Sequence, residues 1–561
     1  MKEQNFMLHP KRRFKLFGFF ISLVFLAAGA LFAETPSAKT TYPKRQTGLY
    51  RDVSDQNIYY EGVEYLRFER LHQLLGQKKR ALDINVFDEI PDSNFFTNRH
   101  SRSRLSSEEL KKGPSVTDGP DASGPWTITK GKFDGITPGF FVKDAKGGKY
   151  LLKFDPEDSL ELGTGAEAIA SRFFHAIGYN VPQYTIANFK KDQLVIKEGA
   201  KVFDKTGFKT ALTADKLDQF LLFVPQTKNG AYRASASRII DGEILGPMRF
   251  LGRRQDDPRD LINHEDRRTV RTLQVFNAWV NNNDVRESNS LDTVQEKNGQ
   301  QEIVHYMIDF NSSLGATPRG PKPPQFGHEY MLDYGETAKA ILTLGLHDKP
   351  WQKRWDEAGR EVASPTVGYF DNHHFDPGKF KTQLPHYAFK DLTRADGFWA
   401  AKIIMSFTDD EIRDIVSTGE FSDPKTANEI SRVLTQRRDL MGRYWFQKAN
   451  PLDHFTFVNL GDSHELHFDD LSVQYGFVDS GKSIYRYEIF TKKGKKKKRI
   501  SKEETTEPSL KLNSHLLEEH SSLDLVIRTR RPGKKEWSPF VSLQIRNHAG
   551  GPQIAGIAHE D

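Results

Sequence analysis

The segment 267–311 constrains the possible folds of this chain more than any other. Apolar residues recur at steps of three and four over 267–280, which predicts a helix. An Asn-rich loop follows, and two apolar runs around a Lys-Asn-Gly turn signal then predict a β-hairpin over 291–308. Such a hairpin would bring Asn289 and Asp309 to one end of the same two-stranded ribbon.

The polar residues of this segment have the spacing of a phosphoryl-transfer centre. In a kinase-type site one Asp orients the attacking hydroxyl, while an Asn and a second Asp hold the magnesium ion that bridges the phosphates. Magnesium is a hard cation that prefers oxygen ligands. We therefore predict Asp284 as the catalytic residue and Asn289 and Asp309 as metal ligands. The alternative is an exposed Asn- and Asp-rich loop between a helix and a hairpin.

A lysine upstream fits the same chemistry. Two apolar runs within 140–154 flank a turn-rich connection and predict a second hairpin. Lys153 lies inside its second strand, where a buried ammonium needs an anionic partner or a path to water. Before it, Gly131, Gly135 and Gly139 are evenly spaced, and glycines there would let backbone N–H groups approach phosphates.

A carboxylate partner for the lysine is available on the next predicted element. Apolar residues recur at helical intervals over 166–177, and Gly178 closes the helix. Glu167 lies near its start and is our candidate partner for Lys153. The alternative is local, because Thr164 to Glu167 also reads as a capping box.

These elements follow one another in the order found in kinases: glycine loop, strand lysine, helix glutamate, then Asp, Asn and Asp. The predicted fold class is therefore α+β, with a bilobal, protein-kinase-like core. The predicted core has a small lobe over 126–240 and a mainly helical large lobe over 241–450, with an N-terminal extension over 34–125 wrapping the small lobe.

Residues 83–450 resemble a family of exported bacterial proteins with an atypical kinase-like core. More distantly, the layout is similar to HipA-like, CotH-like and phosphoinositide-kinase-like proteins. The resemblance rests on residues 87–98, 135–139, 150–156, 178–182 and 284–292. It implies a two-lobed fold with ATP or another nucleotide in the cleft, together with Mg²⁺ or Mn²⁺. By the same resemblance, Lys153 would contact phosphates, Asp284 would be the catalytic Asp, and Asn289 and Asp309 would bind the metal.

The large lobe is predicted to end in helices. They are expected over 394–406, from a cap at Thr408, and from Asp423 to about residue 445, whereas 326–385 shows few helical periods. His373 and His374 invite a metal assignment, but adjacent residues on a strand face opposite ways. Surface or packing histidines are the favoured interpretation.

The C-terminal part, 451–561, is predicted to be an all-β sandwich-like domain. Its short alternating runs are 464–468, 471–477, 484–490, 523–528 and 540–545. Between two of them, seven of the eight residues from Lys492 to Arg499 are cationic. The favoured interpretation is a solvated hairpin tip balanced by Glu503, Glu504 and Glu507. The alternative is contact with anionic lipid.

The first 33 residues are predicted to be a signal peptide. Basic residues precede an almost wholly apolar run and then small residues, so we expect an exported protein, periplasmic or associated with the cell envelope. The alternative is an inner-membrane anchor over 16–33, which is near the minimum length for a span.

Composition narrows the classes of function. The formal net charge is +6, but residues 1–33 hold five Lys or Arg against one acid, which leaves about +2 for the rest. This balance does not favour a nucleic-acid binder. The absence of cysteine excludes disulfides and thiolate zinc sites.

The sequence thus predicts a candidate phosphotransferase, an atypical kinase acting on an envelope protein, lipid or glycan. The alternative is a catalytically inactive kinase-fold protein that serves as a binding or scaffold protein of the cell envelope.

Overall fold

The computed structural model describes residues 41–44, 73, 75–132, 136–203, 208–349, 351–352, 367–461, 463–493, 496–548 and 551–561. The predicted signal peptide or anchor and Gly135 lie outside these residues. In the part that is described, no helix is both long and apolar enough to cross a membrane. The chain divides into a unit of residues 1–42 and a unit of residues 43–561, and all that follows concerns the second.

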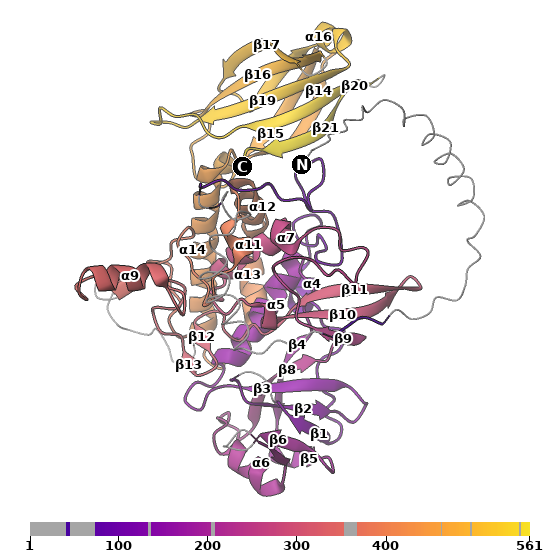
Figure 1. Ribbon diagram of the computed structural model, residues 1–561, viewed down its shortest axis with the longest axis vertical. Helices are drawn as coiled ribbons and strands as arrows, with labels where there is room; N and C mark the ends of the chain where they lie inside the picture. Colours follow the sequence, from indigo (N-terminus) through magenta and orange to yellow (C-terminus); the bar gives the residue numbers. More distant parts are fainter. Residues whose placement is uncertain are drawn as a thin grey trace, which may run out of the picture. The chain divides into compact units, whose positions relative to one another are not determined.

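A six-stranded sheet carries the first part of the predicted site (Figure 1). Its strand order is β4-β8-β3-β2-β1-β5, and all neighbours are antiparallel except β1 and β5. The strands are β1 (Trp126–Gly131), β2 (Gly139–Lys143), β3 (Lys149–Phe154), β4 (Tyr184–Phe189), β5 (Leu194–Ile196) and β8 (Tyr232–Arg238). The predicted second hairpin is confirmed as β2 and β3. Phe140, Phe154 and Phe189 form a buried cluster with residues of α6 (Ala214–Leu221).

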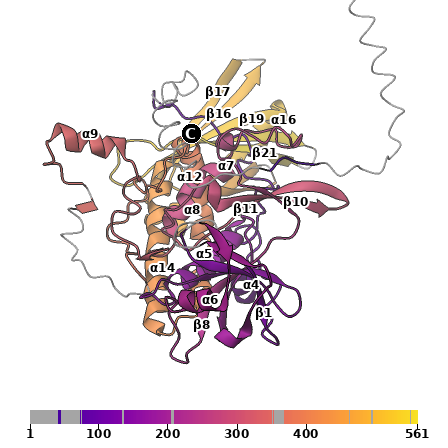
Figure 2. The same ribbon diagram turned by 60° about the horizontal axis from the view of Figure 1, so that its bottom comes forward.

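The helix α5 (Leu162–Ile177) follows β3 and confirms the helix predicted over 166–177. It lies against β4 and β8 (Figure 2). Nearly every side chain of α5 is buried, and Phe173 and Phe174 belong to the largest hydrophobic cluster together with Trp279 and Trp399. This helix therefore joins the sheet to the helical part of the molecule.

The helix predicted over 267–280 is present but interrupted. The structure has α7 (Arg268–Arg271) and α8 (Leu273–Trp279), separated at Thr272. The Thr272 hydroxyl donates to the carbonyl oxygen of Arg268 at 2.7 Å, a backbone bond by a threonine side chain that commonly disturbs a helix. The predicted hairpin follows as β10 (Ser290–Lys297) and β11 (Gln300–Met307), and β9 (Glu243–Gly246) adds a third strand.

Three helices close the helical part as predicted: α12 (Arg394–Met405), α13 (Asp409–Ser417) and α14 (Pro424–Lys448). The Thr408 hydroxyl accepts from the N–H of Glu411, which confirms the predicted cap. Shorter elements are α4 (Ser107–Lys112), α9 (Tyr334–Leu342), α11 (Tyr387–Lys390), β6 (Lys201–Phe203), β7 (Lys209–Ala211), β12 (Ala316–Thr317) and β13 (Gly320–Pro321). Helix α9 was not predicted; Asp333 caps it through the N–H of Glu336.

The C-terminal part contains two antiparallel sheets that share one hydrophobic core. The first is β14 (Leu452–Asn459), β15 (Ser463–Asp470) and β18 (Ser509–Asn513). The second has the order β17-β16-β19-β20-β21, with β16 (Ile484–Lys493), β17 (Lys496–Thr505), β19 (Ser522–Arg530), β20 (Val541–His548) and β21 (Gly551–His559). The expected strand over 471–477 is wrong, because Asp470 caps the short helix α15 (Leu471–Gln474) through the N–H of Ser472. A second short helix, α16 (Ser514–Glu519), follows β18.

The cationic run from Lys492 to Arg499 lies at the turn between β16 and β17. Lys497 pairs with Asp524 at 2.7 Å, and Arg499 pairs with Glu488 at 3.1 Å. Acids on neighbouring strands therefore contact two of its cations. Lipid contact by the cluster stays a prediction.

The predicted N-terminal extension contacts both the sheet and the helices. Gln183 donates through Nε2 to the Thr117 carbonyl at 2.7 Å, beside the sheet. Farther upstream, Glu89 accepts from the Trp399 indole of α12 at 2.8 Å.

Candidate functional site

Lys153 is the centre of a buried cluster of charges. It lies on β3, and its Nζ pairs with Glu167 of α5 and, at 3.0 Å, with Oδ1 of Asp309 after β11. The side chains of Lys153 and Glu167 are 5% and 1% exposed, whereas that of Asp309 is 29% exposed. The structure thus brings together three of the predicted residues, separated by 14 and 156 positions in the chain.

The charges of this cluster oppose the effect of burial. Burial lowers the pKa of Lys153, but the Asp309 and Glu167 carboxylates outweigh it and hold that pKa above its ordinary value. Burial raises the pKa of Glu167 against the opposing effect of Lys153. Burial alone would raise the pKa of Asp309, but Lys153 and then Lys132 outweigh this effect and lower that pKa. Asp309 is therefore the ionised carboxylate, and Glu167 takes up a proton more readily.

Asp155 fixes the position of Glu167 relative to Lys153. It follows β3 directly, and its Oδ1 accepts from the N–H groups of Gly163 and Thr164, both at 2.8 Å. Its Oδ2 accepts from the N–H of Glu161 at 2.9 Å and from the Thr164 hydroxyl at 2.7 Å. One carboxylate thus ties the first turn of α5 to the end of β3.

The capping box considered for Thr164 and Glu167 is wrong. Both residues lie inside α5, which begins at Leu162 and has no side-chain cap from Glu161, the residue before it. The residue that caps α5 is instead Asp155, which accepts from the N–H groups of Gly163 and Thr164. It lies farther along the sequence from those groups than the three residues that a capping box spans. Glu167 is left to pair with Lys153.

Asp309 has a left-handed backbone, with φ of 62°. This region is uncommon for residues other than Gly, although Asp tolerates it better than most. Its N–H donates to the Tyr184 hydroxyl on β4 at 3.1 Å. This strained backbone conformation and the hydrogen bond together place the carboxylate of Asp309 beside Lys153.

The other two predicted residues of this segment, Asp284 and Asn289, lie on the loop before β10. Asn289 donates through Nδ2 to the carbonyl oxygen of Asp284 at 2.7 Å, and its own carbonyl accepts from the N–H of Ile308 at 3.0 Å. Asn289 and Asp309 therefore lie at the same end of the β10–β11 ribbon, as predicted. The Asp284 carboxylate pairs with Arg286, which also donates to Gln383 at 2.9 Å. Sequence reasoning missed Arg286, although a cation two residues after Asp284 was a visible signal.

Two of the three predicted glycines have packing reasons for their identity. A Cβ at Gly139 would lie 2.2 Å from the carbonyl oxygen of Leu152, since β2 and β3 approach closely there. A Cβ at Gly131 would lie 2.9 Å from Val202. Phosphate contact by these glycines stays a prediction.

A hydrogen bond between Thr137 and Asn311 closes the space next to Lys153. Asn311 donates through Nδ2 to the Thr137 hydroxyl at 2.7 Å, and Lys132 donates to the Thr137 carbonyl at 3.0 Å. Lys153, Glu167, Thr137 and Asn311 border a cavity of about 10 Å³. This volume holds about one water molecule.

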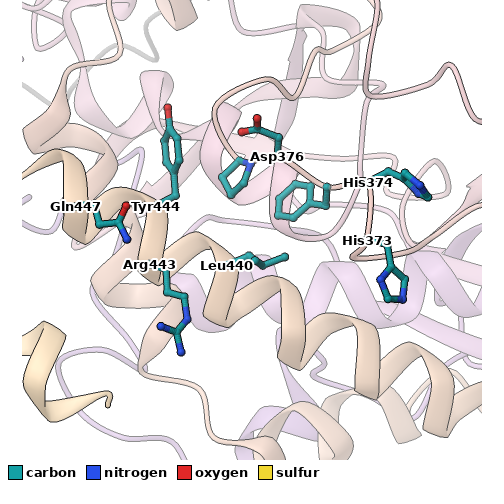
Figure 3. A pocket seen from close by; sticks show the side chains of 9 residues that line it. His373, His374, Asp376, Leu440, Arg443, Tyr444 and Gln447 are labelled. Carbon is teal, nitrogen blue, oxygen red and sulfur yellow. The ribbon is translucent and has the colours of Figure 1, made fainter. Parts of the chain in front are cut away.

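His373 and His374 line a separate pocket of about 540 Å³ (Figure 3). Figure 3 shows their rings pointing in different directions, with Arg443, Tyr444 and Gln447 of α14 opposite them. His374 interacts with the Tyr369 hydroxyl at 3.1 Å. In the described part of the chain, no three His, Asp or Glu side chains form a group that could hold a metal ion.

Comparison with known proteins identifies no family for the chain. No protein-family model matches it, and neither does any curated protein. Among solved structures, a proinflammatory kinase of Helicobacter pylori, CtkA, matches 58% of this chain and 97% of its own at 11% identity and a TM-score of 0.31. A Golgi casein kinase matches 74% of this chain and 94% of its own at 9% identity and a TM-score of 0.28. Similarity at this level does not assign a fold, so the function is argued from the site itself.

Proposed function

We propose that this protein is an atypical kinase, with a two-lobed core that binds a nucleotide and a divalent metal between the six-stranded sheet and the helical part. The observation that carries the proposal is the ion pair of Lys153 with Glu167, joined by Asp309. A lysine on the third strand that pairs with a glutamate on the next long helix is the arrangement that holds phosphates in protein kinases. The structure of this chain contains that pair and a second acidic residue, Asp309, beside it.

The donor set suits magnesium or manganese. Asp309 offers an ionised, partly exposed carboxylate, and Asn289 donates through Nδ2, which leaves its amide oxygen for a metal. A bound Mg²⁺ neutralises charge on the phosphate oxygens. On binding, Lys153 would exchange its contact with Asp309 for a phosphate oxygen while keeping Glu167.

Asp284 is the residue proposed to orient the acceptor hydroxyl. Arg286 holds its carboxylate in one orientation, and Asn289 holds its carbonyl. Catalysis of this kind depends on positioning and charge stabilisation more than on covalent chemistry. The acceptor hydroxyl would therefore have to lie within hydrogen-bond distance of Asp284.

The acceptor is proposed to be a component of the cell envelope, because residues 1–33 have the pattern of an export signal. A protein, lipid or glycan hydroxyl would serve. The cellular location is tested by adding protease to intact cells and to cells with an opened outer membrane. Degradation only after opening supports a periplasmic protein.

One observation favours a second candidate, an inactive binding or scaffold protein. The cavity beside Lys153 holds about one water, and Arg286 already occupies the Asp284 carboxylate. Nucleotide binding requires the Thr137–Asn311 hydrogen bond to open, whereas a scaffold would keep this closed arrangement.

The two candidates differ in how thermal unfolding responds to ATP with Mg²⁺ or Mn²⁺. A nucleotide at 100 times its Kd adds about 2.7 kcal/mol to the folded state. We expect a metal-dependent rise in Tm that Asp309→Ala abolishes. The control variant Asp410→Ala, which changes an exposed residue of α13, should show the same rise as the unchanged protein. Asp284→Asn should keep the rise but lose phosphoryl transfer. No rise with either metal would exclude the kinase proposal and favour the scaffold.

A further inference from the structure

A cavity with a volume of about 990 Å³ lies away from Lys153. Most of its lining comes from residues 76–78, the stretch 377–394 and the C-terminal end of α14. Gln274, Val275, Tyr330 and Asp561 complete it. Six of the lining residues are cationic, and Asp561 is the one acidic residue in the lining. The cations are Lys78, Lys379, Lys381, Lys390, Arg394 and Lys448.

Acids behind the cavity wall neutralise only part of this charge. Lys381 pairs with Asp333 at 2.6 Å, and Lys379 pairs with Asp376 at 3.1 Å. Within the described part of the chain, Lys78, Arg394 and Lys448 form no ion pair with an Asp or Glu side chain, and each of the three contacts a different group.

Lys78 donates to the carbonyl oxygen of Leu392, and Arg394 donates to the backbone oxygen of Asp561 at 2.7 Å. Lys448 lies 5.4 Å from the centre of the Tyr444 ring. Burial lowers the pKa of Lys78 although Asp391 and Asp396 are near it. The cavity therefore carries an excess of positive charge, and a bound anion would relieve it.

The cavity reaches the loop of Asp284 through one buried side chain. His386 lines the cavity and is 2% exposed, and its Nε2 lies 2.8 Å from the carbonyl oxygen of Val285. Burial lowers the pKa of His386 to about 4, so the ring is neutral at pH 7 and Nε2–H donates to that carbonyl. Val285 directly follows Asp284. A ligand in the cavity would thus contact a residue that supports the proposed catalytic loop.

We propose that this cavity is a binding site for a small ligand with several phosphate groups, separate from the proposed nucleotide site. A volume of about 990 Å³ is within the range of small-molecule sites. Guanidinium and ammonium groups from several directions are the donors that phosphate oxygens select. The inference does not depend on the proposed kinase activity, since it rests on the cations of this cavity alone.

The test is a calorimetric titration of the full chain with inorganic tripolyphosphate in metal-free buffer. The variant is the double charge reversal Arg394→Glu with Lys448→Glu, because both side chains are exposed. The matched control is Lys425→Glu with Lys511→Glu, which changes the net charge equally and touches no lining residue of the cavity. We expect binding at least about tenfold weaker in the first variant and unchanged in the control. Lys448→Gln is the milder variant to use if the first fails to fold, and it should weaken binding in the same direction.

Two further arms identify the site and the ligand class. Asp309→Ala should leave tripolyphosphate binding intact, since Asp309 belongs to the other site. An oligomer of glucuronic acid should bind more weakly than tripolyphosphate. The proposal is overturned by equal weakening in the control variant, by loss of binding in Asp309→Ala, or by tighter binding of the glucuronic acid oligomer.

Discussion

Replacing Lys153 with Met tests how much the charge cluster of Lys153, Glu167 and Asp309 contributes to the stability of the fold. Methionine keeps an unbranched side chain of similar length but removes the cation. Glu167, with 1% of its side chain exposed, would then be buried beside Asp309 without a counter-charge. Removing one partner of a buried ion pair costs about 3–5 kcal/mol. Such a loss corresponds to a fall in Tm of roughly 10 °C for the part of the molecule that contains β3.

The loss should depend on pH in a direction that the pKa of Glu167 sets. Burial already raises that pKa, and removal of Lys153 removes the main group that opposes the rise. At pH 5 Glu167 can therefore be protonated in the folded variant, and the penalty shrinks. At pH 8 protonation is less favourable, and the penalty is largest. A second change, Glu167→Gln, should restore most of the lost stability at pH 8.

Thermal unfolding followed by circular dichroism at pH 5 and pH 8 measures both effects. Lys149→Met is the matched control, because Lys149 is on the same strand and exposed. An exposed substitution of this kind is expected to change stability by no more than about 0.5 kcal/mol. If Lys153→Met behaves as this control does, or if its penalty is the same at both pH values, the account of the cluster is refuted.

Two other predictions concern residues that sequence reasoning did not select. Asp155→Ala removes the acceptor of four hydrogen bonds at the start of α5 and should lower the free energy of unfolding by on the order of 2–4 kcal/mol. Ser106→Ala at the exposed cap of α4 should lower it by only about 1 kcal/mol, and chemical denaturation of both variants measures the difference. The lowered pKa of His386 predicts that stability falls as the pH drops from about 6.5 to about 4, because the unfolded state binds the proton first. Over that range the free energy of unfolding should fall by about 3 kcal/mol. His386→Gln should flatten this part of the pH profile of Tm.

The sequence predicted those elements whose signals are local. The hairpin of β10 and β11 has an Asn-Gly turn between two apolar runs, and α5 has a continuous apolar period, so both were found with nearly correct bounds. Lys153, Glu167 and Asp309 could also be selected from the sequence alone. Their selection rested on the chemistry of each residue and on their order along the chain.

Other features depend on contacts that no local pattern encodes. Asp155 caps a helix that begins seven residues later, so a search for a cap within three residues selected Thr164 instead. Thr272 interrupts a helix through its own hydroxyl, although the apolar period continues across it. The cations of the large cavity come from segments more than 300 residues apart, and only the folded chain brings Lys78 near Arg394 and Lys448.

The three residues of the charge cluster, Lys153, Glu167 and Asp309, differ in what their replacement would test. Lys153 and Glu167 are almost fully buried, so their removal would destabilise a scaffold as much as an enzyme. Asp309 is the exposed member, with 29% of its side chain reaching solvent. Its removal leaves the ion pair of Lys153 with Glu167 in place while it takes away the carboxylate proposed to bind metal. A loss of metal-dependent nucleotide binding in Asp309→Ala, with little change in Tm without ligand, therefore reports on function, whereas the Lys153 variants report on the fold.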